Sequence, residues 1–174
     1  MTVITISGKP GTGKSTVAEL LHNKLRISYV YSGVIFRETA KKYNMSLEEF
    51  GKFCEKNNKI DKEIDKKQIN ILKKGNVILE GRLAGWLAYR NNISSFKIFI
   101  NADLKTRVNR IINRENGNIK KRKKEIIERE RSESARYKKY YEINLDDTSI
   151  YDLVIDSTKK SPEEIINIIL EKLE

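Results

Sequence analysis

The chain has 174 residues, of which 39% are hydrophobic and 34% charged, and this size predicts one globular domain. A net charge of +11 favours polyanionic partners, either nucleotides or nucleic acid. No apolar stretch reaches the length of a membrane span, no signal-peptide pattern is present, and the lone Cys54 excludes an internal disulfide. We therefore expect a cytoplasmic protein without a membrane partner, in which Cys54 packs in the interior.

The first predicted elements are a strand, a glycine-rich loop and a helix. Residues 3–6 form a β-branched run typical of a buried parallel strand. Residues 8–16 follow as the loop, and the apolar side chains at 17, 20, 21 and 25 then form one face of a helix. The N-terminal end of that helix favours an anion, so this order predicts a phosphate site.

The loop matches the pattern G-x-x-x-x-G-K-[ST] at all of its fixed positions, which are Gly8, Gly13, Lys14 and Ser15. The glycines allow several backbone N–H groups to converge on one phosphate. The lysine places a positive charge on the β- and γ-phosphates of a nucleotide, and the hydroxyl can bind Mg²⁺. This stretch predicts a nucleotide site more specifically than any other part of the chain.

Four further strands are expected at residues 26–31, 76–80, 96–100 and 151–155, each short and rich in β-branched or aromatic side chains. Because these strands alternate with helical patterns, the sequence predicts a three-layer α/β fold with a five-stranded parallel sheet flanked by helices. The capping sequence at residues 161–164 begins a final apolar-faced helix.

Two connections are longer than a parallel crossover requires. Residues 33–75 are expected to form three helices, the second of them capped at Ser46. Residues 103–142 begin with Asp103 as a helix cap and contain a polar break at 116–118 before a long charged helix. Both connections leave the carboxyl ends of strands, where open α/β sheets bind their ligands, so they are a predicted substrate-binding segment and lid. The predicted core then consists of residues 1–32, 76–102 and 151–174.

Arginines are the main candidates for further phosphate ligands, because their planar fork binds two phosphate oxygens at once. Arg37 and Arg82 follow the ends of predicted strands, which favours a binding role. The lid segment contains 14 Lys or Arg and 7 Asp or Glu. Within it, two arginine pairs each share one helix face: Arg110 with Arg114, and Arg129 with Arg136. Spacing alone leaves these two pairs equally consistent with solvated charges. The lysines of the same segment are expected to be solvated: Lys120, Lys121, Lys123 and Lys124.

Glu80 ends a predicted buried strand beside the phosphate loop, where a carboxylate can hold Mg²⁺ directly or through water; the alternative is a solvent-facing acid. His22 is expected to be structural or exposed. The sequence contains no Ser-His-Asp set, no metal-binding cysteine spacing and no candidate nucleophile.

With these residues in place, the chain resembles the archaeal-type cytidylate kinases, a branch of the nucleoside monophosphate kinases with a phosphate-binding P-loop. The resemblance runs nearly end to end, and the stretches at 79–86 and 129–137 are its most specific parts. It rests on residues 7–15, 32–37, 45–50, 60–65, 79–86, 129–137 and 149–155.

The resemblance implies a P-loop NTPase fold with a mobile monophosphate-binding segment and a lid. It implies transfer of a phosphoryl group from ATP to CMP or dCMP, giving ADP and CDP or dCDP, with Mg²⁺ as cofactor. We expect a monomer whose partners are these nucleotides, without nucleic acid. The selectivity for cytosine rests on the resemblance alone.

The site residues implied by motif and resemblance fall into four groups. The expected catalytic residues are Lys14, Arg114, Arg129 and Arg136. The expected ATP-binding residues are Ser7, Gly8, Lys9, Pro10, Gly11, Thr12, Gly13, Lys14, Ser15, Thr16 and Arg110. The expected CMP-binding residues are Ser32, Arg37, Asp61, Asp65, Gly81 and Arg82, of which Ser32, Asp61 and Asp65 are candidates for reading the base. The expected magnesium residues are Ser15 and Glu80.

Two alternatives remain open at the level of sequence. The first is the same chemistry on AMP or UMP. The second is a basic, RNA-binding P-loop ATPase, for which the net charge is the motivation and the lack of a recognisable RNA module the objection.

Overall fold

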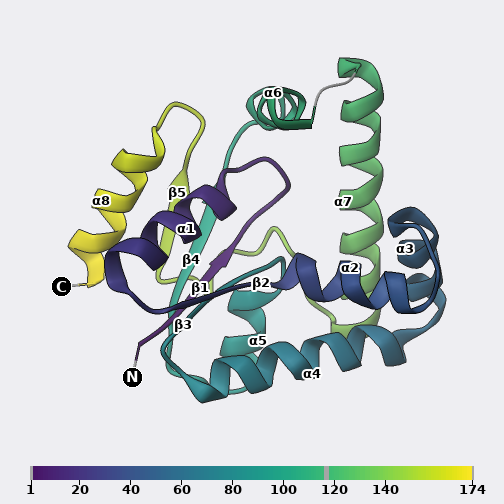
Figure 1. Cartoon of the computed structure of the whole chain (residues 1–174), viewed down its shortest axis with the longest axis horizontal. Helices are drawn as coiled ribbons and strands as arrows, with labels where there is room; N and C mark the ends of the chain where they lie inside the picture. Colours follow the sequence, from purple (N-terminus) through teal and green to yellow (C-terminus); the bar gives the residue numbers. More distant parts are fainter. Residues whose placement is uncertain (1, 116–117, 174) are drawn as a thin grey trace.

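The computed structural model describes residues 2–115 and 118–173 (Figure 1). Its strands form one five-stranded parallel sheet in the order β2-β3-β1-β4-β5. The strands are β1 (Val3–Ser7), β2 (Ser28–Tyr31), β3 (Val77–Glu80), β4 (Phe96–Asn101) and β5 (Leu153–Asp156). The predicted α/β class and five-stranded parallel sheet are confirmed.

Three strands begin later than the sequence suggested. Arg26 and Asn76 have φ angles of 55° and 46°, a left-handed conformation that no strand contains, so β2 and β3 begin after them. Arg26 instead ends the preceding helix, where its N–H donates to the carbonyl of His22 at 2.8 Å. At β5, Tyr151 lies before the strand, and its ring packs 5.1 Å from that of Phe99.

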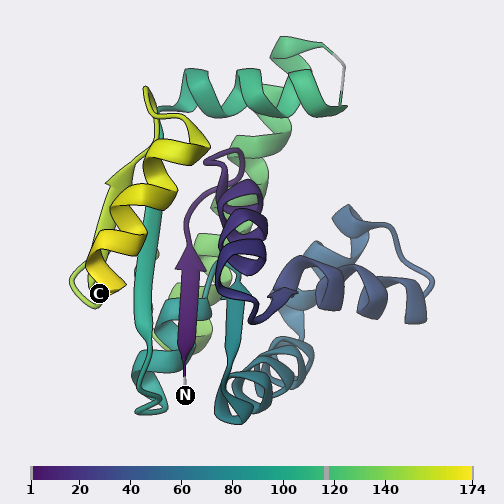
Figure 2. The same ribbon diagram turned by 60° about the vertical axis from the view of Figure 1, so that its left-hand side comes forward.

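Helices cover both faces of the sheet. The helices α1 (Lys14–Leu25) and α8 (Pro162–Leu173) lie side by side over one face (Figure 2). The helices α4 (Asn58–Lys74) and α5 (Ala84–Arg90) cover the other face. Because side chains alternate along a strand, Ile78 packs toward α1 and α8, whereas its neighbours Val77 and Leu79 pack toward α4 and α5. The helix α5 was not predicted.

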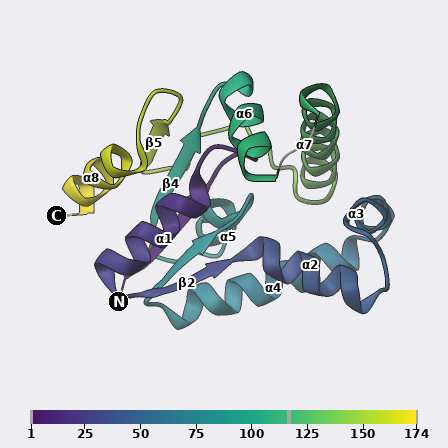
Figure 3. The ribbon, with the colours of Figure 1, turned by 45° about the horizontal axis from the view of Figure 1, so that its top comes forward.

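The two long connections are helical. The first contains α2 (Ser32–Lys42), α3 (Leu47–Lys56) and α4, and the second contains α6 (Leu104–Glu115) and α7 (Ile119–Tyr141). In Figure 3, α2 and α4 run side by side, with α3 next to α7. The α3–α7 contact includes a hydrogen bond from the Tyr140 hydroxyl to the carbonyl of Cys54, 3.0 Å long. The predicted lid segment therefore contacts the predicted substrate segment directly.

The predicted caps are present. Ser46 and Glu49 form a reciprocal capping box, as do Ser161 and Glu164, and Asp103 accepts from the N–H of Thr106 at 2.7 Å. In the predicted polar break, residues 116–117 lie outside the described residues, and Asn118 caps α7 by accepting from the N–H groups of residues 120 and 121.

Several smaller expectations are also confirmed. Cys54 is fully buried beside Phe50, and burial raises the pKa of its thiol to about 12. His22 is half-buried and its Nδ1 lies 2.6 Å from the carbonyl oxygen of Ile27, which is a structural contact. The four lysines at 120, 121, 123 and 124 are exposed. Within the described ranges, no helix is both long and apolar enough to cross a membrane.

Candidate active site

The phosphate loop connects β1 to α1 in a conformation that requires its glycines. A Cβ on Gly8 would lie 2.1 Å from the carbonyl oxygen of Ile100, closer than any real contact. Gly13 has a φ angle of 89° and directly precedes α1. Gly8 is therefore required by the close approach of the loop to β4, and Gly13 by the left-handed backbone conformation in front of α1, whose N-terminus favours an anion.

Lys14 folds back over this loop. Its Nζ donates to the carbonyl of Lys9 at 2.7 Å, and the side chain is buried. Burial and, second to it, the nearby Arg82 charge lower the pKa of Lys14 to about 7, against the opposing effect of Glu80. A phosphate bound here would favour the charged amine, so the affinity for a nucleotide is linked to protonation of Lys14.

Two arginines of α6 donate hydrogen bonds to backbone carbonyls of the phosphate loop. Arg107 donates to the carbonyls of Ala102 and Pro10 at 3.2 and 3.3 Å. Arg110 donates to the carbonyl of Thr12 at 3.3 Å and to that of Ser157 at 2.7 Å. Arg107 was missed in the sequence, although its spacing of three residues from Arg110 places both on one helix face. Arg114, one turn beyond Arg110, has an exposed side chain.

Glu80 and Ser15 meet at the end of β3. The Ser15 hydroxyl donates to Oε1 of Glu80 at 2.9 Å, and the Tyr29 hydroxyl donates to Oε2 at 2.6 Å. Glu80 is only 1% exposed, so the solvent-facing alternative for this residue is wrong. Tyr29 was not anticipated, because nothing in a strand sequence shows which carboxylate a tyrosine will contact.

A hydroxyl and a buried carboxylate at this position fit Mg²⁺, which is held by few protein oxygens and otherwise by water and phosphate. In the described part of the chain, no group of three or more His, Cys, Asp or Glu side chains that could hold a metal ion occurs. Ser15 would bind the ion directly, and Glu80 would accept from Ser15 and from metal-bound water.

Replacing Tyr29 with Phe is expected to lower the free energy of unfolding by about 1.5–3 kcal/mol. The buried Glu80 carboxylate, a charged acceptor, loses the hydrogen bond that the Tyr29 hydroxyl donates to it. Urea unfolding measures this loss. The matched control is Tyr89→Phe, at a tyrosine with 53% exposure, which should change stability by less than about 0.5 kcal/mol. Equal effects of the two substitutions would contradict the assigned contact.

A network of charges extends from the phosphate loop to α7. Arg82 donates through Nη1 to the carbonyl of Gly8 at 2.6 Å and through Nε to Glu133 at 2.6 Å. Glu133 also accepts from Nε of Arg129 at 3.0 Å. Burial alone would raise the pKa of Glu133, but the charges of Arg82 and then Arg129 lower it to about 2. Two arginines predicted to bind phosphate are therefore brought together, and Glu133, which joins them, was missed in the sequence.

A second buried cluster joins α7 to α4. Nε of Arg136 lies 3.3 Å from Oδ2 of Asp61, and both side chains are nearly inaccessible. Among the described residues these two atoms have no hydrogen-bond partner, so their contact is an ion pair without good hydrogen-bond geometry. Asp65 accepts from the hydroxyl of Tyr141 and, at 3.1 Å, from the amide of Gln68.

Of the remaining predicted CMP residues, Ser32 and Gly81 lie near this cluster and Arg37 does not. A Cβ on Gly81 would lie 2.1 Å from the Ser32 hydroxyl oxygen and 3.5 Å from the side-chain oxygen Oε1 of Gln68, so these three residues are neighbours. Arg37 is exposed and lies 5.1 Å over the ring of Tyr31. The structure thus groups Ser32 and Gly81 with Asp65 through Gln68 and leaves Arg37 at the open end of β2.

Comparison with known proteins identifies the family of this chain. Residues 3–159 match the model of the cytidylate kinase-like family. The chain belongs to this family. It is 48% identical to a cytidylate kinase of Methanocaldococcus jannaschii over 96% of this chain and 94% of that protein. It is 41% identical to a cytidylate kinase of Pyrococcus horikoshii over 96% of this chain and 85% of that protein.

The fold of this cytidylate kinase-like chain also matches that of P-loop kinases of known structure. The shikimate kinase of Bacteroides thetaiotaomicron superimposes with a TM-score of 0.62, covering 99% of this chain and 98% of that one at 14% identity. At this identity the match establishes the fold alone. The expected family and P-loop kinase fold are both confirmed.

The outer residues of the phosphate loop have different surroundings. The hydroxyl of Ser7 accepts from the N–H of Gly85 at 3.1 Å and is buried, so this side chain anchors α5. Thr16 is exposed at the start of α1, and Lys9 is paired with Asp146 at 2.7 Å. The assignment of these residues to ATP remains a prediction.

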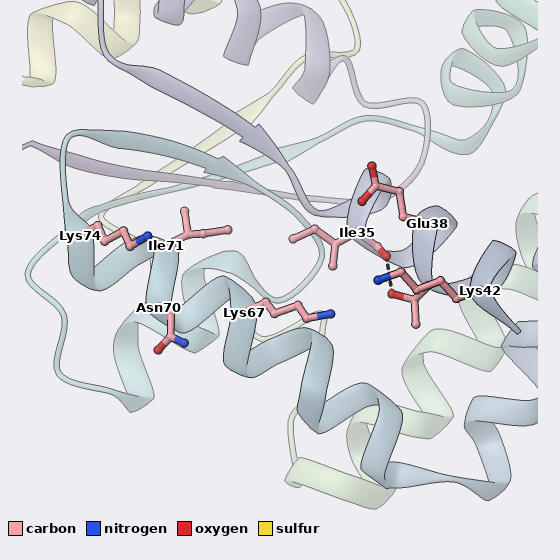
Figure 4. Close-up of a pocket in the computed structure, with 8 residues that line it drawn as sticks. Ile35, Glu38, Lys42, Lys67, Asn70, Ile71 and Lys74 are labelled. Atoms are coloured by element: carbon pink, nitrogen blue, oxygen red, sulfur yellow. Dashed lines mark hydrogen bonds between the residues drawn. The ribbon is translucent and has the colours of Figure 1, made fainter.

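A separate pocket of about 370 Å³ lies between α2 and α4 (Figure 4). It shares none of the predicted nucleotide-binding residues. Thr39 in its wall donates to the carbonyl of Ile35 at 2.7 Å, so this hydroxyl is already satisfied. The pocket is lined by Ile35, Glu38, Thr39, Lys42, Lys67, Asn70, Ile71 and Lys74.

Protonation of Asp65 is expected to make stability depend on pH. Burial raises the pKa of this carboxyl to about 7, although the hydrogen bond from Tyr141 opposes the shift. Because the folded state then binds the proton more tightly than the unfolded state, the free energy of unfolding should fall by about 2–4 kcal/mol as pH rises from 4 to 7.

Urea unfolding of the wild type and of Asp65→Asn across pH 4–8 measures this dependence. The variant keeps one acceptor oxygen for Tyr141 but cannot ionise, so its stability should change less with pH over this interval. Parallel curves for the two proteins would contradict the assignment.

Proposed function

We propose that this chain transfers the γ-phosphoryl group of ATP to CMP and dCMP, with the residues of the phosphate loop, Arg82 and α7 as its active site. Cytidylate kinase activity, which is that of an ATP-dependent nucleoside monophosphate kinase, follows from membership of the family. The single structural observation that carries the proposal is the position of Arg82 between Gly8 and Glu133. An arginine there is close to a nucleotide bound in the loop and is connected through Glu133 to Arg129 of the lid segment.

The proposed roles follow from charge. Phosphoryl transfer requires positioning and positive charge around the moving group rather than covalent chemistry by the protein. Lys14 and Arg110 would bind ATP, with Arg114 near its phosphates, and Arg82 with Arg37 would hold the monophosphate. Arg129 and Arg136 would stabilise the transferring phosphoryl group. The acceptor is already an anionic phosphate, so no general base is needed.

Mg²⁺ would be bound by Ser15, with Glu80 as the second residue of the site, and it would neutralise charge on the β- and γ-phosphates. The hydrogen bond between Ser15 and Glu80 supports this assignment, since it orients the hydroxyl oxygen at the mouth of the loop. Both oxygens of Glu80 already accept hydrogen bonds, which favours contact with the ion through water.

The base would be read at the buried end of the substrate segment. Asp61, Asp65 and Ser32 remain the candidates, and the structure adds Gln68, whose amide donates to Asp65. Carboxylate and amide oxygens accept from the exocyclic amine of cytosine, whereas uracil presents a carbonyl at that position. We further propose that the protein works as a monomer in the cytoplasm.

The test is ADP formation from Mg·ATP with CMP, dCMP, UMP and AMP supplied separately. Turnover with CMP and dCMP and little with UMP or AMP would support the proposal. Fast turnover with AMP or UMP instead would favour the other monophosphate kinases. Equal turnover without any acceptor would favour the RNA-binding ATPase, for which RNA affinity should fall steeply with salt.

A further inference from the structure

Glu133 lies within the stretch 129–137 on which the family resemblance rests, but neither the motif nor the resemblance gives it a role. It lies on α7, one turn beyond Arg129, and its side chain is 12% exposed. One carboxylate oxygen accepts from Nε of Arg82 at 2.6 Å and the other from Nε of Arg129 at 3.0 Å. Arg82 continues the chain of contacts to the phosphate loop through the carbonyl of Gly8. A single carboxylate thus links the loop to the lid helix.

The atoms used in these contacts are informative. A guanidinium carries five N–H donors, and a carboxylate on Nε leaves the outer Nη groups to bind an oxyanion. Both arginines contact Glu133 through Nε. The carboxylate therefore fixes the orientation of the two side chains without occupying all of the donors that phosphate would use.

The surrounding charge explains why an acid is placed here. The charges of Arg82 and Arg129 both act on Lys14, and the charge of Glu133 acts on Lys14 with the opposite sign. Without an anion between them, the two arginines would repel and turn toward solvent, especially Arg129, whose side chain is 56% exposed. Glu133 balances this cluster before any phosphate is bound.

We propose that Glu133 is a positioning residue for phosphoryl transfer, which holds Arg82 and Arg129 in the orientation that presents both to phosphate. The inference rests on the proposed function, because it requires these arginines to bind the reacting phosphates. Glu133 acts through them and does not contact the nucleotides.

The first measurement is steady-state ADP formation by Glu133→Gln with CMP as acceptor. Glutamine keeps the size and one acceptor oxygen but lacks the charge and second acceptor, so kcat should fall about 10–100-fold and the KM for CMP should rise several-fold. The KM for ATP should stay within about twofold. The matched control is Glu128→Gln, an exposed acid on the same helix, which should remain within twofold of the wild type in all three parameters.

A double-mutant cycle separates positioning from a structural role. If Glu133 acts through Arg82 and Arg129, the substitution Glu133→Gln should lower kcat by a clearly smaller factor when added to Arg129→Ala than when added to the wild type, because only its effect on Arg82 then remains. A multiplicative loss, or a single variant within twofold of the wild type, would overturn the inference. If Glu133→Gln lacks a cooperative urea transition, the same cycle is measured with Glu133→Asp, which keeps the charge.

The cycle is interpreted against the acceptor panel. A wild type that does not phosphorylate CMP would overturn the proposed function and this inference with it. A wild type that phosphorylates CMP, with no coupling between positions 133 and 129, would overturn the inference alone.

Discussion

Replacing Arg129 with Ala is expected to lower kcat by about 10²–10⁴-fold, by analogy with arginines that stabilise transition-state charge in phosphoryl transfer. The side chain is held at Nε by Glu133 and is 56% exposed, so its Nη groups lie at the surface of the charged cluster. Because an exposed arginine contributes little to stability, the unfolding free energy should change by less than about 1 kcal/mol. ADP formation and urea unfolding measure the two quantities.

The control for this prediction is Arg131→Ala. Arg131 lies two residues away on α7, is 81% exposed and lies 3.9 Å from Glu128 in a long ion pair. The substitution Arg131→Ala removes the same charge from the same helix as Arg129→Ala. The two residues are two positions apart, so Arg131 points to a different side of α7 from the one that meets Arg82 and Lys14. Turnover by Arg131→Ala should stay within twofold of the wild type, and equal losses in both variants would show a general effect of charge instead of a specific one.

The strand-loop-helix at the N-terminus was predictable because its signals are local. The pattern from Gly8 to Ser15 depends on backbone conformation and on one helix N-terminus, both of which short sequences determine. The caps at Ser46 and Ser161 were predictable for the same reason, since each involves residues three positions apart. The parallel sheet followed from the alternation of strands and helices, whereas its strand order was not predicted from the sequence.

The pairing of charges was not predictable, because it joins residues far apart in the chain. Arg82 and Glu133 are separated by 51 positions, and Ser15 and Glu80 by 65. No periodicity records which acid a given arginine meets, and the outcome depends on how α7 packs against the end of the sheet. Spacing placed Arg129 and Arg136 on one helix face but could not show that one is half exposed and the other buried.

This difference between the two arginines leads to the second large prediction. Arg136→Ala is expected to lower the free energy of unfolding by about 3–5 kcal/mol at pH 8, because it leaves Asp61 buried without its cation. Burial already raises the pKa of Asp61, with the Arg136 charge opposing the shift. Loss of that charge raises the pKa further, so the carboxyl takes up a proton more readily and the destabilisation should be smaller at pH 5. Urea unfolding at both pH values measures it.

A double variant then separates stability from catalysis. Asp61→Asn combined with Arg136→Met removes both charges and keeps most of the volume, so it should recover at least half of the stability that Arg136→Ala loses at pH 8. Its kcat with CMP should nevertheless remain about 10²–10⁴-fold below that of the wild type, because the phosphoryl group still lacks its cation. Recovery of turnover together with stability would mean that Arg136 serves only the fold, and Arg129 would then be the remaining lid arginine proposed to act on the phosphoryl group.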